Sequence, residues 1–172
     1  MTISGKRILL IDGAHYDRLR KVLGIVIDFG VLRTVLAEDG PISSAHYHRD
    51  LRDADEAHRQ QGLLDWLSRH GFEVLGDDNS EVGDLPRERY GTNLVGLAID
   101  AMELAQSGDE VLLMGGDFKL APLVISLVER SVKVTLVSTL HAPPSIAPHE
   151  HLVAECSAFI DLHDHREAIA RT

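Results

Sequence analysis

Two short apolar runs that each lead into an aspartate restrict how this chain can fold. Residues 111–114 (VLLM) precede Gly115-Gly116-Asp117, and residues 7–11 (RILLI) precede Asp12-Gly13. A short apolar run bounded by glycines is typical of a strand buried in a sheet. An acid after such a strand lies at its carboxyl end, which is the edge of an open α/β sheet where ligands bind. Asp12 and Asp117 are therefore candidates for one shared site.

The rest of the sequence alternates strand and helix patterns, and this alternation predicts a parallel sheet covered on both faces. Further strands are expected at 42–48, 72–75, 133–138 and 159–161. Helical patterns occupy 18–23, 31–36, 54–69, 92–106 and 120–130, with Gly71 ending one helix and Thr92 or Asn93 capping another. Residues 76–89 and 139–150 are expected to be loops. The prediction is a single three-layer α/β/α domain over residues 1–172, doubly wound and mostly parallel.

Composition restricts the partners and the compartment. The chain has 172 residues, 44% of them hydrophobic, which suits one globular domain, and its formal net charge is −10. A nucleic-acid partner would therefore need a local basic face; the small groups Arg18, Arg20, Lys21 and Arg87, Arg89 are interpreted as solvated surface. One cysteine, Cys156, excludes an internal disulfide and favours a reducing compartment, with a buried, inert thiol. The first residues contain too short an apolar run for a signal peptide or membrane span, so the cytoplasm is expected.

Aspartates at the ends of two neighbouring strands would face a common cleft. Oxygen ligands there suit Mg²⁺ or Mn²⁺, and such ions assist phosphodiester hydrolysis by activating water and stabilising the leaving oxygen. An aspartate before a helix is also often only an N-cap or a turn residue. The residues alone leave both interpretations open.

The order of three motifs resembles the NYN domain, a family that includes the LabA-like proteins within the PIN-like nuclease superfamily. These motifs are IDGAH (11–15), GTNLVGLAIDAMELA (91–105) and LLMGGDFKLAPLV (112–124), and the resemblance extends over residues 7–162. It implies a sheet in the order 3-2-1-4-5, which makes the strands of Asp12 and Asp117 neighbours. It also implies a metal-dependent ribonuclease with aspartates around Mg²⁺ or Mn²⁺.

The chain departs from the family pattern at several acidic positions. Asn93 stands where the family has an aspartate, and Lys119 replaces the second acid of its Gly-Asp-x-Asp-Phe motif. Asp100 corresponds to the family's helix aspartate, one residue late, and His15 stands where the family usually has asparagine. Asn93 still offers an oxygen to a metal, whereas Lys119 would repel a divalent ion, pair with Asp117 or bind phosphate. His15 is interpreted either as a general base or metal ligand, or as a polar side chain of a turn.

Three functions follow from this set. The first is an RNA-cleaving enzyme that uses Mg²⁺ or Mn²⁺ held by Asp12, Asp117 and Asn93, with Asp100 as a further catalytic residue. The second is a degenerate NYN protein that binds nucleic acid or a nucleotide, or acts in regulation. The third is a changed enzyme in which Lys119, His15 and Asp117 act without metal on a small phosphorylated ligand. A homo-oligomer is compatible with the sequence, which does not give an oligomeric state.

Other patterns point to no competing chemistry. The group His149, His151, Cys156, His163 and His165 lacks a standard zinc spacing, and its histidines are interpreted as surface residues. The Gly115-Gly116 pair lacks the Lys and Ser/Thr spacing of a P-loop. Trp66 has the helical spacing of a core residue.

Overall fold

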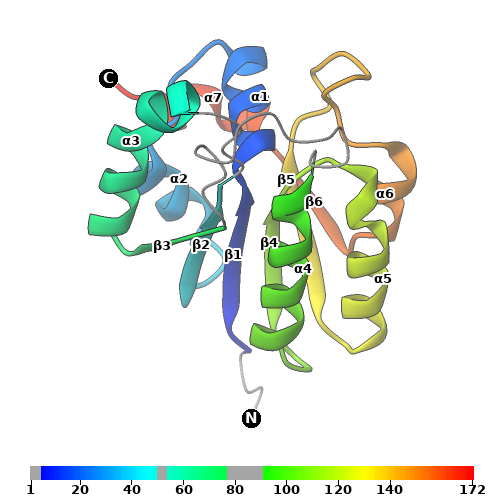
Figure 1. Cartoon of the computed structure of the whole chain (residues 1–172). Coiled ribbons are helices and arrows are strands. Elements are labelled where there is room, and N and C mark those ends of the chain that lie inside the picture. The colour runs from blue at the N-terminus through cyan, green and yellow to red at the C-terminus, as the bar shows by residue number, and fades with distance from the viewer. Residues whose placement is uncertain (1–4, 50–53, 77–90) are drawn as a thin grey trace.

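The protein folds into six parallel strands between two layers of helices (Figure 1). This computed structural model describes residues 5–49, 54–76 and 91–172. The strand order is β3-β2-β1-β4-β5-β6, so the predicted order is confirmed and a sixth strand extends the sheet beyond β5. Among the described residues, no helix is both long and apolar enough to cross a membrane.

The element bounds are as follows. The strands are β1 (Arg7–Asp12), β2 (Ser44–His48), β3 (Phe72–Leu75), β4 (Glu110–Met114), β5 (Lys133–Ser138) and β6 (Ala158–Asp161). The α-helices are α1 (Gly13–Leu23), α2 (Phe29–Leu36), α3 (Ala54–Arg69), α4 (Thr92–Leu104), α5 (Ala121–Glu129), α6 (Glu150–Glu155) and α7 (Arg166–Ile169). Short 3-10 helices cover Phe118–Leu120 and Leu162–His165.

Two hydrophobic cores hold the helices on the sheet. Helices α1, α2, α3 and α7 cover one face, and α4, α5 and α6 cover the other (Figure 1). The central strands supply both cores, because alternate side chains point to opposite faces. In β1, Leu9 and Ile11 belong to the first core, while Ile8 and Leu10 belong to the second, and all four are buried. Burial on both faces explains why β1 and β4 read as continuous apolar runs.

Several helix ends differ from the sequence prediction. Helix α1 begins at Gly13 instead of Arg18, because the Asp12 side chain accepts a hydrogen bond from the Ala14 nitrogen and caps it. Neither Thr92 nor Asn93 caps α4: its N-cap is Gly91, with φ 82° and no side-chain cap bond. Part of the predicted loop at 139–150 becomes the start of α6, and α7 was not predicted. The predicted loop at 76–89 lies, after Gly76, outside the described residues.

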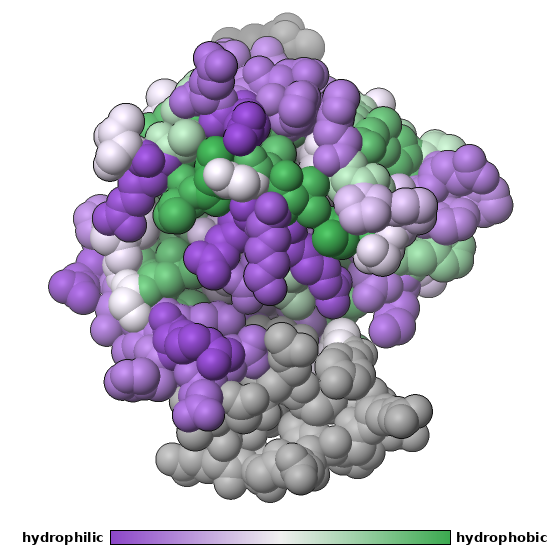
Figure 2. Space-filling view, turned by 90° about the horizontal axis from the view of Figure 1, so that it is seen from above, coloured by the Kyte–Doolittle hydropathy of each residue, from purple (hydrophilic) through white to green (hydrophobic). Residues whose placement is uncertain are grey.

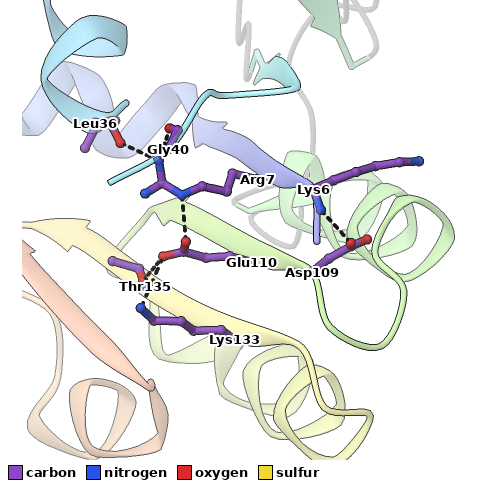
Figure 3. Close-up of polar contacts among 8 residues, drawn as sticks. All are labelled: Lys6, Arg7, Leu36, Gly40, Asp109, Glu110, Lys133 and Thr135. Atoms are coloured by element: carbon purple, nitrogen blue, oxygen red, sulfur yellow. Dashed lines mark hydrogen bonds and ion pairs between the residues drawn. The ribbon is translucent and has the colours of Figure 1, made fainter. Parts of the chain in front are cut away.

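A largely buried ion pair joins β1 to β4 at the amino edge of the sheet (Figure 3). Arg7 Nε lies 2.7 Å from Glu110 Oε2, and the two residues are register partners. The same guanidinium donates to the backbone oxygens of Leu36 and Gly40. Thr135 Oγ1 donates to the other Glu110 oxygen at 2.6 Å. Burial acts to raise the pKa of Glu110, but the bonds from Thr135 and Arg7 outweigh it and hold this pKa below its ordinary value.

We expect Arg7→Met to lower the free energy of unfolding by about 3 kcal/mol, because it leaves the Glu110 carboxylate enclosed without its main partner. Lys133→Met is the matched control: its amine lies 3.7 Å from the same carboxylate but the side chain is 56% exposed. Its loss should stay below about 1 kcal/mol. Urea denaturation measures both, and equal losses would contradict the assignment of Arg7 as the main partner.

Candidate active site

A polar pocket of about 320 Å³ lies at the carboxyl edge of the sheet. Asp12, the last residue of β1, and Asp117, in the turn after β4, both line it. Strands β1 and β4 are paired neighbours, so the fold brings together the two aspartates that the sequence singled out. Figure 2 views the molecule from above, onto the side where α1 begins, and much of that surface is hydrophilic.

Asp12 is buried and held by several donors. Its Oδ1 accepts hydrogen bonds from Asn93 Nδ2 at 2.7 Å and from the Ala14 nitrogen at 3.1 Å. Burial raises the pKa of the Asp12 carboxyl above its ordinary value, while the bonds from Asn93 and the backbone act in the opposite direction. A carboxylate that is kept at such a desolvation cost, at the edge of a pocket, is typical of functional sites.

Asn93 reaches the pocket from the first turn of α4. Besides binding Asp12, its Nδ2 lies 3.3 Å from the His48 backbone oxygen. The amide therefore donates hydrogen bonds and positions the Asp12 carboxylate against β2. The prediction that its oxygen binds a metal stays a prediction.

The side chains of Asp117 and Lys119 face each other in the turn that follows β4. The Asp117 side chain caps the 3-10 helix by accepting a bond from the Lys119 nitrogen at 2.9 Å. Lys119 Nζ lies 3.9 Å from Asp117 Oδ2, and the lysine side chain is 64% exposed. A Cβ added at Gly91 would lie 3.3 Å from this Nζ, so the glycine leaves room for the lysine over the pocket. The pair is therefore a loose, solvated one, of the kind that contributes little to stability.

Four charged residues that the sequence analysis did not place in the site also line the pocket, including two cations that it had interpreted as solvated surface. They are the acids Asp17 and Glu56 and the cations Arg18 and Lys21. Gln60 Nε2 donates to Asp17 Oδ2 at 3.2 Å and lies 3.4 Å from Glu56 Oε1, linking α1 to α3. The helical pattern of α1 could have indicated its three charged pocket residues in advance. They lie on the face of the helix opposite the buried Tyr16, Leu19 and Leu23. Glu56 could be placed only by the packing of α3.

His15 is not among the residues that line the polar pocket. Its ring is 2% exposed, and its Nε2 shares a hydrogen bond of 2.8 Å with Ser138 Oγ. A Cβ on Gly116 would lie 2.5 Å from the ring, which explains why glycine precedes Asp117. Burial first, and then the charge of Arg18, lowers the pKa of His15 to about 4, so the ring is neutral at pH 7.

Asp100 also lies away from the pocket. It is on α4 about two turns beyond Asn93, and its Oδ2 lies 3.3 Å from His48 Nε2. The contact is not aligned as a hydrogen bond, and Nε2 has no hydrogen-bond partner within the part of the chain that the structure describes. Burial lowers the pKa of His48, while the Asp100 charge acts to raise it. The structure therefore places Asp100 against a buried histidine of β2.

Trp66 has the core role that the sequence suggested, whereas Cys156 is half-buried instead of buried. Trp66 packs against the first core and stacks on His70, with ring centroids 4.0 Å apart. Burial raises the pKa of the half-buried Cys156 thiol to about 11, so the thiol is protonated at pH 7.

The donor set fits a divalent ion held largely by water. Within the described residues, no group of three or more His, Cys, Asp or Glu side chains is arranged to hold a metal. Mg²⁺ does not need such a cage, because it keeps several waters and is commonly bound by one or two carboxylates. Asp12 and Asp117 line the same pocket and would supply these two carboxylates. The hydrogen bonds given above use Oδ1 of each, and Lys119 Nζ lies near Oδ2 of Asp117.

We expect Asp12→Asn to raise the melting temperature at pH 7 by a few degrees. The folded-state pKa of Asp12 is raised, so the folded protein holds this proton more tightly and loses stability as pH rises from about 3.8 through that pKa. Asparagine keeps the helix cap and can accept the Asn93 bond without burying a charge. The gain should shrink toward pH 4 in thermal melts. Asp28→Asn, at the half-exposed cap of α2, should give no such gain.

Titration of His15 should give a second pH dependence of stability, opposite in sign to that of Asp12. Its folded-state pKa of about 4 lies below the ordinary 6.5, so the unfolded chain binds more protons between these values. The free energy of unfolding should therefore rise with pH across that window, by up to about 3 kcal/mol. His15→Asn should remove this part of the slope in denaturant titrations, and His141→Asn, at a ring 57% exposed, should not. An unchanged slope in His15→Asn would contradict the buried neutral ring.

Comparisons with known proteins identify the family and support the fold. The NYN domain matches residues 6–163. No curated protein matches the chain significantly. A solved structure of a protein of unknown function from Vibrio parahaemolyticus RIMD 2210633 is similar in fold, with a TM-score of 0.68 and 20% identity over 94% of this chain and 96% of that chain. Because the NYN match covers nearly the whole sequence, the protein belongs to the NYN domain family, within the PIN-like nuclease superfamily.

Proposed function

We propose that this protein is a metal-dependent ribonuclease whose active site is the polar pocket. The family suggests a nuclease fold and ribonuclease activity. The observation that carries the proposal is that Asp12 and Asp117, from neighbouring strands, line one pocket together with Arg18, Lys21 and Lys119. Carboxylates suit a hard divalent cation, and the three cations suit the phosphates of a substrate.

Each side chain has a distinct part in this proposal. Asp12 and Asp117 would hold the ion, which when bound supplies Lewis acidity toward the scissile phosphate and the attacking water. Asn93 holds the Asp12 carboxylate in place through its 2.7 Å bond. Arg18 and Lys21 bring positive charge to a molecule of net charge −10, and so give RNA a local place to bind.

The charge of Lys119 would lower the affinity of the pocket for a divalent ion. At its present 3.9 Å from Asp117 Oδ2 it competes with a divalent cation for that carboxylate. The side chain is largely exposed, so its movement toward an incoming phosphate would cost little. We infer that Lys119 binds a substrate phosphate when the ion occupies Asp117.

Asn93 and Lys119, which stand in place of acids of the family pattern, favour a second candidate, a protein that binds phosphate without hydrolysing RNA. Asn93 supplies an amide where a third carboxylate would hold metal, and Lys119 already neutralises Asp117 in part. The pocket would then bind a nucleotide-like anion through its cations. The two candidates differ in metal binding, which can be measured directly.

RNA cleavage with Mn²⁺ or Mg²⁺ tests the first candidate. Wild type should cleave single-stranded RNA, and Asp12→Asn and Asp117→Asn should each lose more than about 100-fold in rate, beyond the loss typical of outer-sphere changes. Asp39→Asn is the control, since this exposed aspartate follows α2 at the opposite edge of the sheet. EDTA should abolish the activity. Cleavage that survives in both aspartate variants would contradict the proposal.

Calorimetric titration with Mn²⁺ separates the two candidates. If the ribonuclease proposal holds, wild type binds Mn²⁺ and Asp12→Asn does not. Lys119→Asp should bind the ion more tightly than wild type, because a repelling charge becomes an additional ligand. Wild type that neither binds Mn²⁺ nor cleaves RNA, together with binding gained in Lys119→Asp, would favour the phosphate-binding protein.

A further inference from the structure

A second hollow, here called the side groove, adjoins the polar pocket. It has a volume of about 480 Å³ and lies between the turn after β4 and residues 144–150, which form the loop before α6 and the first residue of that helix. Arg18 and Asp117 line both hollows, so the two are contiguous. A ligand that reaches Asp117 in the pocket therefore has the side groove directly beside it.

Aromatic rings gather along the side groove. Phe118 is 52% exposed, and its ring centroid lies 5.1 Å from that of His149, with the planes at 58°. The ring centroid of His149 lies 4.9 Å from that of His151. The local structure fixes this arrangement, because Leu120 is buried in the second core while Phe118, in the same 3-10 turn, stays at the surface. His149 is held by its role as the cap of α6, where its side chain accepts a bond from the His151 nitrogen.

The charges around the side groove suit an uncharged ring better than a second phosphate. Asp117 and Glu150 line it, with Arg18 as the cation on the side shared with the polar pocket. Among the described residues Arg18 is the one Lys or Arg that lines the side groove, so a second phosphate placed beyond it would meet Glu150 without a further cation of this kind, whereas the polar pocket also has Lys21 and Lys119. A nucleobase carries no charge at pH 7 and stacks well on aromatic side chains. The apolar wall of Ile146 and Pro148 completes a surface suited to a flat ring.

We propose that the side groove is a nucleobase subsite, in which Phe118 and His149 stack one unpaired base of a nucleotide whose phosphate lies in the polar pocket. Arg18 spans the two hollows and lies where the sugar-phosphate linkage would pass. This inference rests on the proposed function, because the phosphate of the same nucleotide would lie in the polar pocket. A base can enter such a groove only when it is splayed out of a duplex, so the subsite selects unpaired nucleotides.

Binding measured in EDTA tests the subsite without any need for cleavage. The probes are a fluorescent single-stranded oligouridylate and an abasic oligomer of the same length, titrated by fluorescence anisotropy. Phe118→Ala should weaken oligouridylate binding about tenfold and leave abasic binding unchanged. Phe118→Tyr should retain wild-type affinity. His149→Asn, which keeps the helix cap but removes a ring, should show a smaller base-dependent loss.

Ile99→Ala is the matched control, because Ile99 is as exposed as Phe118, at 52%, but lies on the outer face of α4. It should bind both probes as wild type does. Competition with uridine 5′-monophosphate separates the two sources of such a ligand. Effective displacement identifies a free nucleotide, weak displacement identifies RNA, and a dependence on Phe118 in either case supports the subsite.

Failure of the subsite and failure of the ribonuclease proposal give different results. Equal losses for the two probes in Phe118→Ala, or no loss for either, would overturn the subsite even if wild type cleaves RNA. No binding of RNA or uridine 5′-monophosphate by wild type would also overturn it. A base-dependent loss in Phe118→Ala would support the subsite even if wild type shows no metal-dependent cleavage.

Discussion

The parallel pairing of β1 with β4 determines where every candidate site residue lies. The pairing is fixed at the amino edge by the Arg7–Glu110 ion pair and along its length by side chains buried in both cores. A shift of one residue would turn each apolar side chain to the other face, so the register is strongly specified. With that register, Asp12 and the turn that carries Asp117 reach the same edge of the sheet.

Asp12 and Asp117 have a local structural role in addition to their place at the pocket. Asp12 and Asp117 each cap the helical turn that follows them, so the same carboxylates that face the pocket also begin the next element. This explains why the interpretation as simple caps and the interpretation as site residues could not be separated in the sequence. Burial distinguishes them: Asp12 is 3% exposed, far more enclosed than a cap requires. A buried carboxylate beside a polar pocket has a cost that a binding role can explain.

The sequence predicted the fold and the central pair of aspartates better than their surroundings. Strand order and most element bounds followed from apolar periodicity and the family resemblance, because these patterns are local or shared within the family. Asp100 was assigned to the site by its correspondence to the family's helix aspartate, and His15 by its place near Asp12. In the structure Asp100 contacts His48, and His15 contacts Ser138. Which way a side chain turns from a known helix depends on packing across the sheet, and one sequence does not record that packing. Glu56 was missed for the same reason, since α3 approaches the pocket only in the folded chain.

The replacement of acids by Asn93 and Lys119 changes the electrostatic balance of the pocket. A site with more carboxylates would hold a divalent ion tightly before substrate arrives, whereas Asp12 and Asp117, with Lys119 beside Asp117, would hold it weakly. Substrate phosphate would then complete the binding of the ion, since it attracts both the metal and Lys119. Affinity for RNA must come partly from elsewhere in a protein of net charge −10, and stacking on Phe118 is an uncharged source. Under these proposals the weak metal site of the polar pocket and the exposed aromatic ring of the side groove would complement each other in binding one nucleotide.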